Sequence, residues 1–294
     1  MIVTDIIELN LERLEGFLSP CKLCPRECGA DRVNGQVGFC GAPDKVKISS
    51  TGAHFGEEPP ITGIAGSGTI FFSYCTLSCK FCQNYPISQL HNGKYITIAE
   101  LSDIMLKLQK DGCHNVNLVT PTHYTPQIAR AIINAKSRGL EIPIVYNTSG
   151  YERVEVLECL EGLIDVYLPD AKYSDDKHAV ECSNVSGYVE HNRKALLEMW
   201  RQVGEFEEDD NGFAKKGLIV RHLVLPHNKS GTEETLNWIA QNIPDARVSL
   251  MSQYFPAHNA LLEPELNCTI DKNEYELYQT LLERNELSGW SQPL

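Results

Sequence analysis

"TIFFSYCTLSCKFCQ", residues 69–83, joins the two features that decide the fold of this chain. Its first half is rich in β-branched and aromatic residues, which is typical of a buried strand. Its second half carries Cys75, Cys79 and Cys82 within eight residues. Three thiolates on one loop can hold three irons of a [4Fe–4S] cube and leave the fourth iron without a protein ligand. A zinc site completed by a distant ligand and three unrelated thiols are the alternatives that this spacing leaves open.

Around and beyond this stretch, the sequence alternates between short apolar runs and amphipathic segments. Near-continuous apolar strands joined by helices indicate a parallel sheet with both faces covered and right-handed connections. Six such units predict an α/β fold, a partial (β/α)6 barrel of the TIM type, with a doubly wound open sheet as the alternative. The expected strands are 69–75, 115–120, 142–149, 164–173, 217–226 and 247–254. The expected helices are 97–112, 125–139, 151–162, 188–204, 232–244 and 271–289.

The pattern divides the chain into three parts. Residues 1–68 form an N-terminal extension, with a helix over 1–20, a cysteine-rich stretch, and irregular backbone over 41–68, where prolines and glycines gather. Residues 69–256 form the barrel, and residues 257–294 form a C-terminal helical tail. Thr97 followed by Glu100 predicts a capping box at the start of the first barrel helix.

Composition limits the class of protein. The chain has 294 residues and a net charge of −13, which makes a nucleic-acid partner unlikely, since phosphate backbones would repel it. It has no apolar run long enough to span a membrane, and the acidic residues near its start argue against a signal peptide. A cytoplasmic protein is therefore expected. Its 11 cysteines are then better explained by metal binding than by disulfides.

A second cysteine cluster precedes the first strand. Cys21, Cys24, Cys28 and Cys40 follow the spacing C-x2-C-x3-C-x11-C. Four thiolates can close a tetrahedral zinc site or hold an auxiliary iron–sulfur cluster. No residue in the stretch separates the two, although the neighbouring three-cysteine motif favours iron–sulfur.

Polar residues stand where the expected strands end. In barrels of this type the functional groups lie at the carboxyl ends of the strands, so these residues are candidates for the site. They are Cys75, Thr120 with His123, Asn147, Asp170, Arg221 and Gln253.

The three-cysteine motif, C-x3-C-x-aromatic-C with Phe81 as the aromatic residue, resembles the signature of the radical S-adenosylmethionine (SAM) superfamily. In that family the free iron binds SAM, and an electron from the cluster cleaves SAM to methionine and a 5′-deoxyadenosyl radical. The resemblance extends over nearly the whole chain to a branch related to pyruvate formate-lyase activating enzyme. The stretches that carry it are "EEPPITGIAGSGTIFFSYCTLSCKFCQNYPIS", "NLVTPTHYTPQI", "YNTSGYE" and "LPDAKY".

The resemblance implies SAM contacts after the second and third barrel strands. Activating enzymes carry Gly-Gly-Glu after the second strand, where it meets the SAM amino group. This chain reads TPTH at 120–123, so Thr120 and His123 are the candidates, although His123 could instead cap a turn. Asp-Thr-Asn-Gly after the third strand appears as NTSG at 147–150, which makes Asn147 and Ser149 candidates. Asn147 replaces one of two aspartates that help hold a monovalent cation in activating enzymes.

The resemblance also implies contacts at the last three strands. Asp-Leu-Lys appears as DAK, so Asp170 and Lys172 would meet the SAM ribose or carboxylate, or line the substrate pocket. Arg221 resembles a polar SAM contact, and Gln253 and Tyr254 lie where activating enzymes place a further cofactor contact. Asp170 and Lys172 could instead form a plain ion pair at the barrel mouth. Arg221 could instead form a structural pair with an acidic residue.

The sequence therefore predicts an oxidoreductase of the activating-enzyme type, with a [4Fe–4S] cluster and SAM as cofactors. Its expected partners are a reductant such as flavodoxin or ferredoxin and a substrate, for which a protein or peptide is one option. Formation of a glycyl radical and modification of an amino-acid side chain are the reactions considered. A non-catalytic iron–sulfur or zinc protein, acting as an electron carrier or a scaffold, is the alternative.

Overall fold

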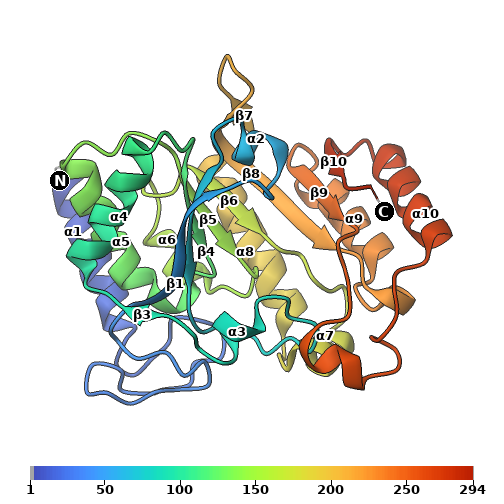
Figure 1. Cartoon of the computed structure of the whole chain (residues 1–294), viewed down its shortest axis with the longest axis horizontal. Helices are drawn as coiled ribbons and strands as arrows, with labels where there is room; N and C mark the ends of the chain where they lie inside the picture. Colours follow the sequence, from blue (N-terminus) through green and yellow to red (C-terminus); the bar gives the residue numbers. More distant parts are fainter. Residues whose placement is uncertain (1–2, 294) are drawn as a thin grey trace.

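The computed structural model describes residues 3–293 and shows a curved sheet with helices on its outer face (Figure 1). Six neighbouring strands of this sheet pair in parallel, in the order β2, β4, β5, β6, β8 and β9. They span Ser67–Phe72, Val116–Val119, Ile144–Thr148, Val166–Pro169, Ala214–Leu223 and Arg247–Met251. These are the six strands that the sequence predicts. Within the described residues the sheet does not close, so the fold is α/β and matches a partial TIM-type barrel.

Short strands extend the sheet at both edges. At one edge β1 (Lys47–His54) pairs antiparallel with β2, and β3 (Lys94–Tyr95) pairs with β1. At the other edge β10 (Gly289–Ser291) pairs in parallel with β9. The small strand β7 (Glu207–Glu208) lies beside β8. The expected irregular backbone over 41–68 is therefore wrong for β1, in which Ile48 is buried and the other residues are half-buried or exposed.

Helices follow the strands as the barrel prediction requires. The long ones are α1 (Val3–Gly16), α4 (Ile98–Lys110), α5 (Thr125–Ser137), α8 (Tyr188–Val203), α9 (Thr232–Asn242) and α10 (Lys272–Arg284). The shorter ones are α2 (Pro59–Thr62), α3 (Tyr85–Ser88), α6 (Val154–Glu158) and α7 (Asp176–Ser183), with 3-10 turns η1 (Thr122–Tyr124), η2 (Pro226–Asn228) and η3 (His258–Leu262). The capping box at Thr97 and Glu100 is present as predicted. No helix among residues 3–293 is long and apolar enough to cross a membrane.

The buried apolar residues form four clusters, of which one packs around the three-cysteine loop through Leu77 and Phe81 and another lies within the N-terminal extension. The largest cluster lies between the sheet and the helices, with Leu118 and Tyr146 of the strands among its buried residues. A smaller cluster fills one end of the barrel, where Ile61 of α2 packs with Val145 and Ile219. Because α2 occupies that end, the hollow space inside the barrel is left toward the carboxyl ends of the strands.

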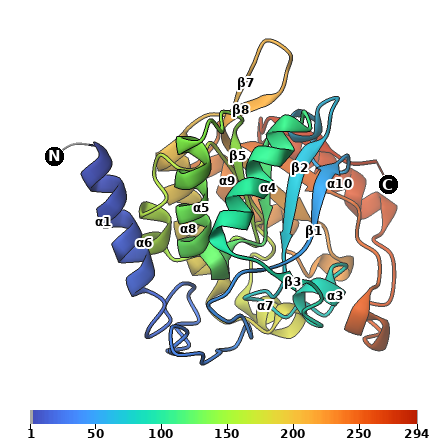
Figure 2. The same ribbon diagram turned by 60° about the vertical axis from the view of Figure 1, so that its left-hand side comes forward.

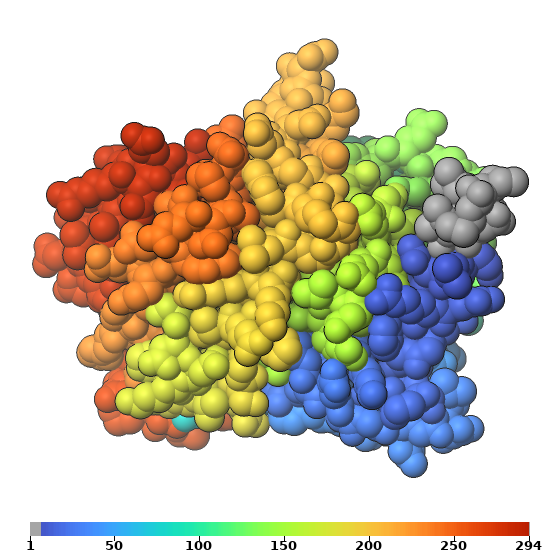
Figure 3. Space-filling model, turned by 180° about the vertical axis from the view of Figure 1, so that it is seen from behind, coloured from blue at the N-terminus to red at the C-terminus, as the bar shows by residue number. Residues whose placement is uncertain are grey.

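The cysteine-rich loop that follows α1 lies at the same end of the molecule as α3 and α7, the lower end in Figure 1. After a turn of 60° the loop is seen below α1, α6 and α5 (Figure 2). Arg153, which precedes α6, donates to the carbonyl of Lys22 at 2.8 Å and pairs with Glu27 at 3.3 Å. From behind, the N-terminal segment packs directly against the barrel surface (Figure 3). The extension is thus attached to the end of the barrel that carries the candidate site.

Candidate active site

A cavity of about 390 Å³ lies at the carboxyl ends of the parallel strands. Its wall includes Phe71 of β2 and Met251 of β9, so strands from both ends of the parallel series border it. Most of the residues predicted from the sequence line this one cavity. They are Cys75, Cys79, Phe81, Cys82, Thr120, Asn147, Ser149, Asp170, Lys172, Arg221 and Gln253.

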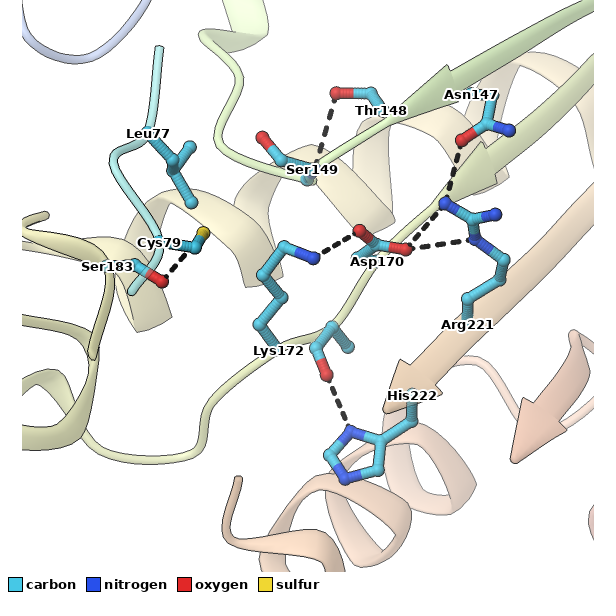
Figure 4. Close-up of polar contacts among 12 residues, drawn as sticks. Leu77, Cys79, Asn147, Thr148, Ser149, Asp170, Lys172, Ser183, Arg221 and His222 are labelled. Atoms are coloured by element: carbon cyan, nitrogen blue, oxygen red, sulfur yellow. Dashed lines mark hydrogen bonds and ion pairs between the residues drawn. The ribbon is translucent and has the colours of Figure 1, made fainter. Parts of the chain in front are cut away.

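The three-cysteine loop is held in place by hydrogen bonds to the C-terminal end of α7. The backbone N–H of Ser78 donates to the carbonyl of Ser183 at 3.1 Å, and the N–H of Lys80 donates to that of Cys182 at 2.8 Å. The Ser183 hydroxyl also donates to Cys79 Sγ at 2.9 Å (Figure 4). No helix is expected from the sequence at 176–183, because this segment is short and has few apolar residues at helical spacing. Its C-terminal end nevertheless positions one of the cysteines.

Each sulfur of the loop has a polar neighbour. The N–H of Leu77 donates to Cys75 Sγ at 3.4 Å, and the Ser88 hydroxyl lies 3.2 Å from Cys82 Sγ. Burial raises the pKa of Cys79 to about 11 and raises that of Cys75 further. The Cys75 and Cys79 thiols are therefore protonated at neutral pH unless a metal displaces the protons. Three cavity-facing thiols with neighbouring donors fit a thiolate-bound iron–sulfur cluster.

A network of charged side chains forms the opposite wall. Asp170 accepts from Lys172 Nζ at 2.5 Å and from Arg221 at 2.8 and 2.9 Å (Figure 4). Arg221 also donates to Asn147 Oδ1 at 2.7 Å. Burial acts to raise the pKa of Asp170, but the charges of Arg221 and Lys172 outweigh it and hold that pKa below its usual value. The carboxylate is thus ionised, and the two cations next to it remain charged.

Buried groups outside the cavity fix the backbone of this network. The carbonyl of Asp170 accepts from the Asn192 amide at 2.8 Å and from the Tyr188 hydroxyl at 3.0 Å. His222 is fully buried, and burial lowers its pKa to about 4, so its ring is neutral. Its Nδ1 lies 2.6 Å from the carbonyl of Ala171, which can only accept, so Nδ1 carries the proton. His222 therefore anchors the residue between Asp170 and Lys172.

Glu57 is a cavity residue that the sequence reasoning missed. It follows β1 and precedes α2, and it lies 3.7 Å from Arg221 and 3.4 Å from the Asn147 amide. Burial raises its pKa, and the charge of Arg221 acts in the opposite direction. The only available signal was its place in "EEPP", directly before the segment that fills the end of the barrel.

Two predicted residues do not reach the cavity. His123 is buried and lies with Nε2 2.7 Å from the carbonyl of Ser73, and burial lowers its pKa to about 3. Tyr254 donates to the carbonyl of Leu266 at 2.5 Å and packs on Phe81, with ring centroids 5.9 Å apart. Of the two candidates after the second strand, only Thr120 lines the cavity among the described residues. Its backbone has a left-handed φ of 59°.

The four N-terminal cysteines line a second, smaller cavity together with Arg32, Thr76 and His123. The thiols are Cys21, Cys24, Cys28 and Cys40. Burial raises the pKa of Cys24 to about 12. Nowhere in residues 3–293 do three or more Cys, His, Asp or Glu side chains converge on a point where a single metal ion would fit. The two sets of thiols border cavities instead.

Comparison with known proteins identifies similar sequences and folds. The family model described as "Radical SAM superfamily" matches residues 69–239. An uncharacterized protein of Methanocaldococcus jannaschii is 29% identical over 291 residues, which cover 96% of this chain and 80% of that protein. Methylornithine synthase (PylB) has a similar fold, with a TM-score of 0.51 and 15% identity over 74% of this chain and 61% of that one. SuiB of Streptococcus suis, solved bound to SAM, gives a TM-score of 0.49 and 16% identity over 75% and 45% of the two chains. The chain thus spans less than two thirds of either solved structure.

Proposed function

This chain belongs to the radical SAM superfamily, and from that premise we propose that it removes a hydrogen atom from a protein or peptide substrate. Membership supports an enzyme that cleaves SAM at an iron–sulfur cluster. When bound and reduced, a [4Fe–4S] cluster with SAM supplies a 5′-deoxyadenosyl radical that abstracts hydrogen from the substrate. The observation that carries the proposal is the single cavity in which the three cysteine thiols face the Asp170 charge network.

The residues of the cavity divide into two groups by chemistry. Cys75, Cys79 and Cys82 would hold the cluster, because thiolates are the ligands that iron–sulfur clusters take. Lys172 and Arg221 would bind the SAM carboxylate, since both stay cationic in the buried network. They also keep Asp170 ionised, and an ionised carboxylate can accept from the amino group or the ribose hydroxyls of SAM.

A buried aromatic side chain, Phe81, would exclude water from the same cavity. Phe81 lies between two of the cluster cysteines, is 6% exposed, and packs on Tyr254 from β9's end of the barrel. A reactive radical must be kept from solvent. Phe81 therefore serves as a shield next to the reacting atoms, whereas the charged residues serve to orient SAM.

Exposed apolar side chains beside the cavity favour a protein or peptide as substrate. Phe255, two residues after the cavity residue Gln253, is 53% exposed, and Leu262 of η3 is 81% exposed. The turn η3 is joined to the three-cysteine loop, because the N–H of Ala260 donates to the carbonyl of Lys80 at 2.8 Å. Exposed apolar groups that gather next to a site mark surfaces for binding other macromolecules. Formation of a glycyl radical and modification of an amino-acid side chain both fit such a substrate.

Cleavage of SAM is tested with a matched pair of cysteine variants. Reduced, anaerobically reconstituted protein should release 5′-deoxyadenosine from SAM, and Cys79→Ala should abolish the release without unfolding the barrel. Cys113→Ala is the control, because Cys113 is buried and isolated from both cavities. An intact cluster that releases no 5′-deoxyadenosine would favour the non-catalytic electron carrier instead.

The substrate class is tested with deuterium. A uniformly deuterated cell extract is divided into a fraction above about 10 kDa and one below about 3 kDa, and each is added to the reaction. Deuterium in 5′-deoxyadenosine is expected with the large fraction only, since carbon-bound deuterium reaches it only by direct transfer. Labelling from the small fraction alone would overturn a protein substrate while leaving SAM cleavage intact.

A further inference from the structure

The four-cysteine cavity is closely built around its sulfur atoms. The N–H of Cys21 donates to the carbonyl of Ala30 at 2.9 Å, and the N–H of Gly29 donates back to that of Cys21 at 3.1 Å. A side chain on Gly38 would place its Cβ 2.2 Å from Cys28 Sγ, so only glycine fits against that sulfur. The loop is thus ordered around the thiols although Cys28 itself is exposed.

Arg32 brings a buried positive charge to this cavity. Its side chain is 1% exposed, and it donates to the carbonyls of His123 at 2.6 Å and Pro43 at 2.7 Å. Within the described part of the chain no carboxylate lies in ion-pair distance of it. A buried charge without a partner is strongly unfavourable. Arg32 lines the same cavity as the four thiols, so the arginine indicates that the cavity holds negative charge.

Two buried donors in the same wall lack acceptors. Among residues 3–293, Arg32 Nε and Thr76 Oγ1 are buried and find no hydrogen-bond partner. Both residues line the four-cysteine cavity, and Thr76 is also 1% exposed. Buried donors are almost always satisfied in folded proteins. Sulfur atoms of a thiolate-bound centre would accept from both.

Consecutive residues of one segment line the four-cysteine cavity and the active-site cavity, so this segment is a wall that the two cavities share. Thr76 lines the four-cysteine cavity, whereas its neighbours Cys75 and Leu77 line the active-site cavity. Arg26 fixes this wall, because its Nε donates to the carbonyl of Thr76 at 2.6 Å. The same guanidinium donates to the carbonyl of Asn184 at 2.5 Å, next to the serine that donates to Cys79. The cysteine-rich loop is thereby attached both to the Cys75–Cys79 segment and to the end of α7 that contacts Cys79.

We propose that Cys21, Cys24, Cys28 and Cys40 hold a second iron–sulfur cluster that passes electrons, one at a time, across the Cys75–Thr76 segment to the active-site cluster. The proposal deepens the proposed function, since SAM cleavage consumes one electron in each turnover. A low-potential one-electron donor in solution reduces the second cluster. Passed across the shared wall, that electron would be the one that cleavage of the carbon–sulfur bond of SAM consumes, and no proton would be transferred. A structural zinc ion is the competing occupant.

The occupant is tested without SAM. In the Cys75→Ala, Cys79→Ala, Cys82→Ala triple variant, anaerobic reconstitution should yield bound iron and sulfide and an electron paramagnetic resonance signal after reduction by dithionite. Zinc without iron would overturn the proposal. In this background Arg32→Gln should lower the midpoint potential of the remaining cluster, because a positive charge is lost, while Arg32→Lys should stay near the parent. Equal potentials in all three would show that Arg32 does not act on the site.

The relay is tested by magnetic resonance and by reduction rate. In the fully reduced wild type the signals of the two clusters should be broadened and fast-relaxing, because the shared wall keeps them close. Cys24→Ala with Cys40→Ala should restore a narrow active-site signal and slow reduction of that cluster by a limiting donor at least tenfold. Circular dichroism confirms that the variant is folded. Unchanged line width or an unchanged reduction rate would refute the relay, and neither result depends on SAM cleavage.

Discussion

The buried carboxyl of Glu152 should make the free energy of unfolding depend on pH, and the size of this effect follows from its raised pKa. Its side chain is fully buried. Thr122 Oγ1 donates to its Oε1 at 2.5 Å, Thr148 Oγ1 donates to the same oxygen, and Oε2 has no partner among the described residues. Burial raises the pKa of Glu152 to about 7 from an ordinary value of 4.5, because the two hydroxyls offset only part of the desolvation. The folded protein therefore binds this proton more tightly than the unfolded chain does.

The sign and size of the effect follow from that difference. The stabilisation by the neutral carboxyl is complete below pH 4.5 and is lost as the pH rises through about 7. Each pKa unit corresponds to about 1.4 kcal/mol, so the loss amounts to about 3 kcal/mol, most of it between pH 5 and 8. Glu152→Gln keeps an acceptor for the two threonine hydroxyls and cannot ionise, so it should lack this loss.

The assay is urea unfolding of both proteins under argon, followed by tryptophan fluorescence at several values from pH 5 to 8. The free energy of unfolding of the wild type minus that of Glu152→Gln should fall with pH, because all other titrating groups are common to both. A difference that stays constant within about 0.5 kcal/mol, or that increases with pH, would refute the assigned pKa.

Two further substitutions test how the Asp170 network is held. His222→Phe leaves the carbonyl of Ala171 unpaired, so we expect a loss of about 2 kcal/mol in stability and an increase of roughly tenfold in the dissociation constant for SAM, measured by calorimetry. Unchanged affinity would show that the anchor does not orient the site. Gly150→Ala places a Cβ 2.1 Å from the carbonyl of Asp170 at a φ of 72°, so roughly 2 kcal/mol or more should be lost, together with SAM binding. Gly112→Ala is the control, because Gly112 has a φ of 88° but its added Cβ would meet no atom within 4 Å. It should lower stability and leave SAM binding unchanged. Equal SAM affinities in the two glycine variants would contradict the expected clash at Gly150.

The sequence was sufficient for the barrel and for most of the cavity because both depend on local patterns. Apolar strands separated by helices give parallel pairing, and parallel pairing brings the polar ends of the strands to one edge. Asp170, Asn147 and Arg221 therefore meet although they are distant in the chain. The sequence reasoning also placed Thr97 correctly as a cap, since a capping box lies within four residues.

What the sequence could not provide depends on contacts between distant segments. His123 follows the second strand as a ligand would, but its ring turns to the backbone of Ser73 and to the four-cysteine cavity. Glu57 lies in a stretch of prolines, and its role appears only when β1 and α2 carry it into the barrel. Nothing in the local sequence distinguishes Arg32 from a surface arginine. Only the fold shows that it is buried, with no carboxylate in residues 3–293 within ion-pair distance.

The unclosed sheet has a consequence for how a macromolecule would be admitted. A complete ring of strands forms a well, and a chain can enter it only from above, with a free end or a sharply folded hairpin. Here the cavity touches Phe71 near one margin of the sheet and Met251 near the other, with no hydrogen-bonded strand between those margins in residues 3–293. Side-chain and loop contacts, such as the hydrogen bond from Gln83 Nε2 to the carbonyl of Gln253 at 2.9 Å, join these margins in place of a strand. Such contacts are lost at lower cost than a ladder of backbone hydrogen bonds, so under the proposed function a loop in the middle of a folded protein would be admitted from the side, and the residue that loses its hydrogen need not be near a terminus.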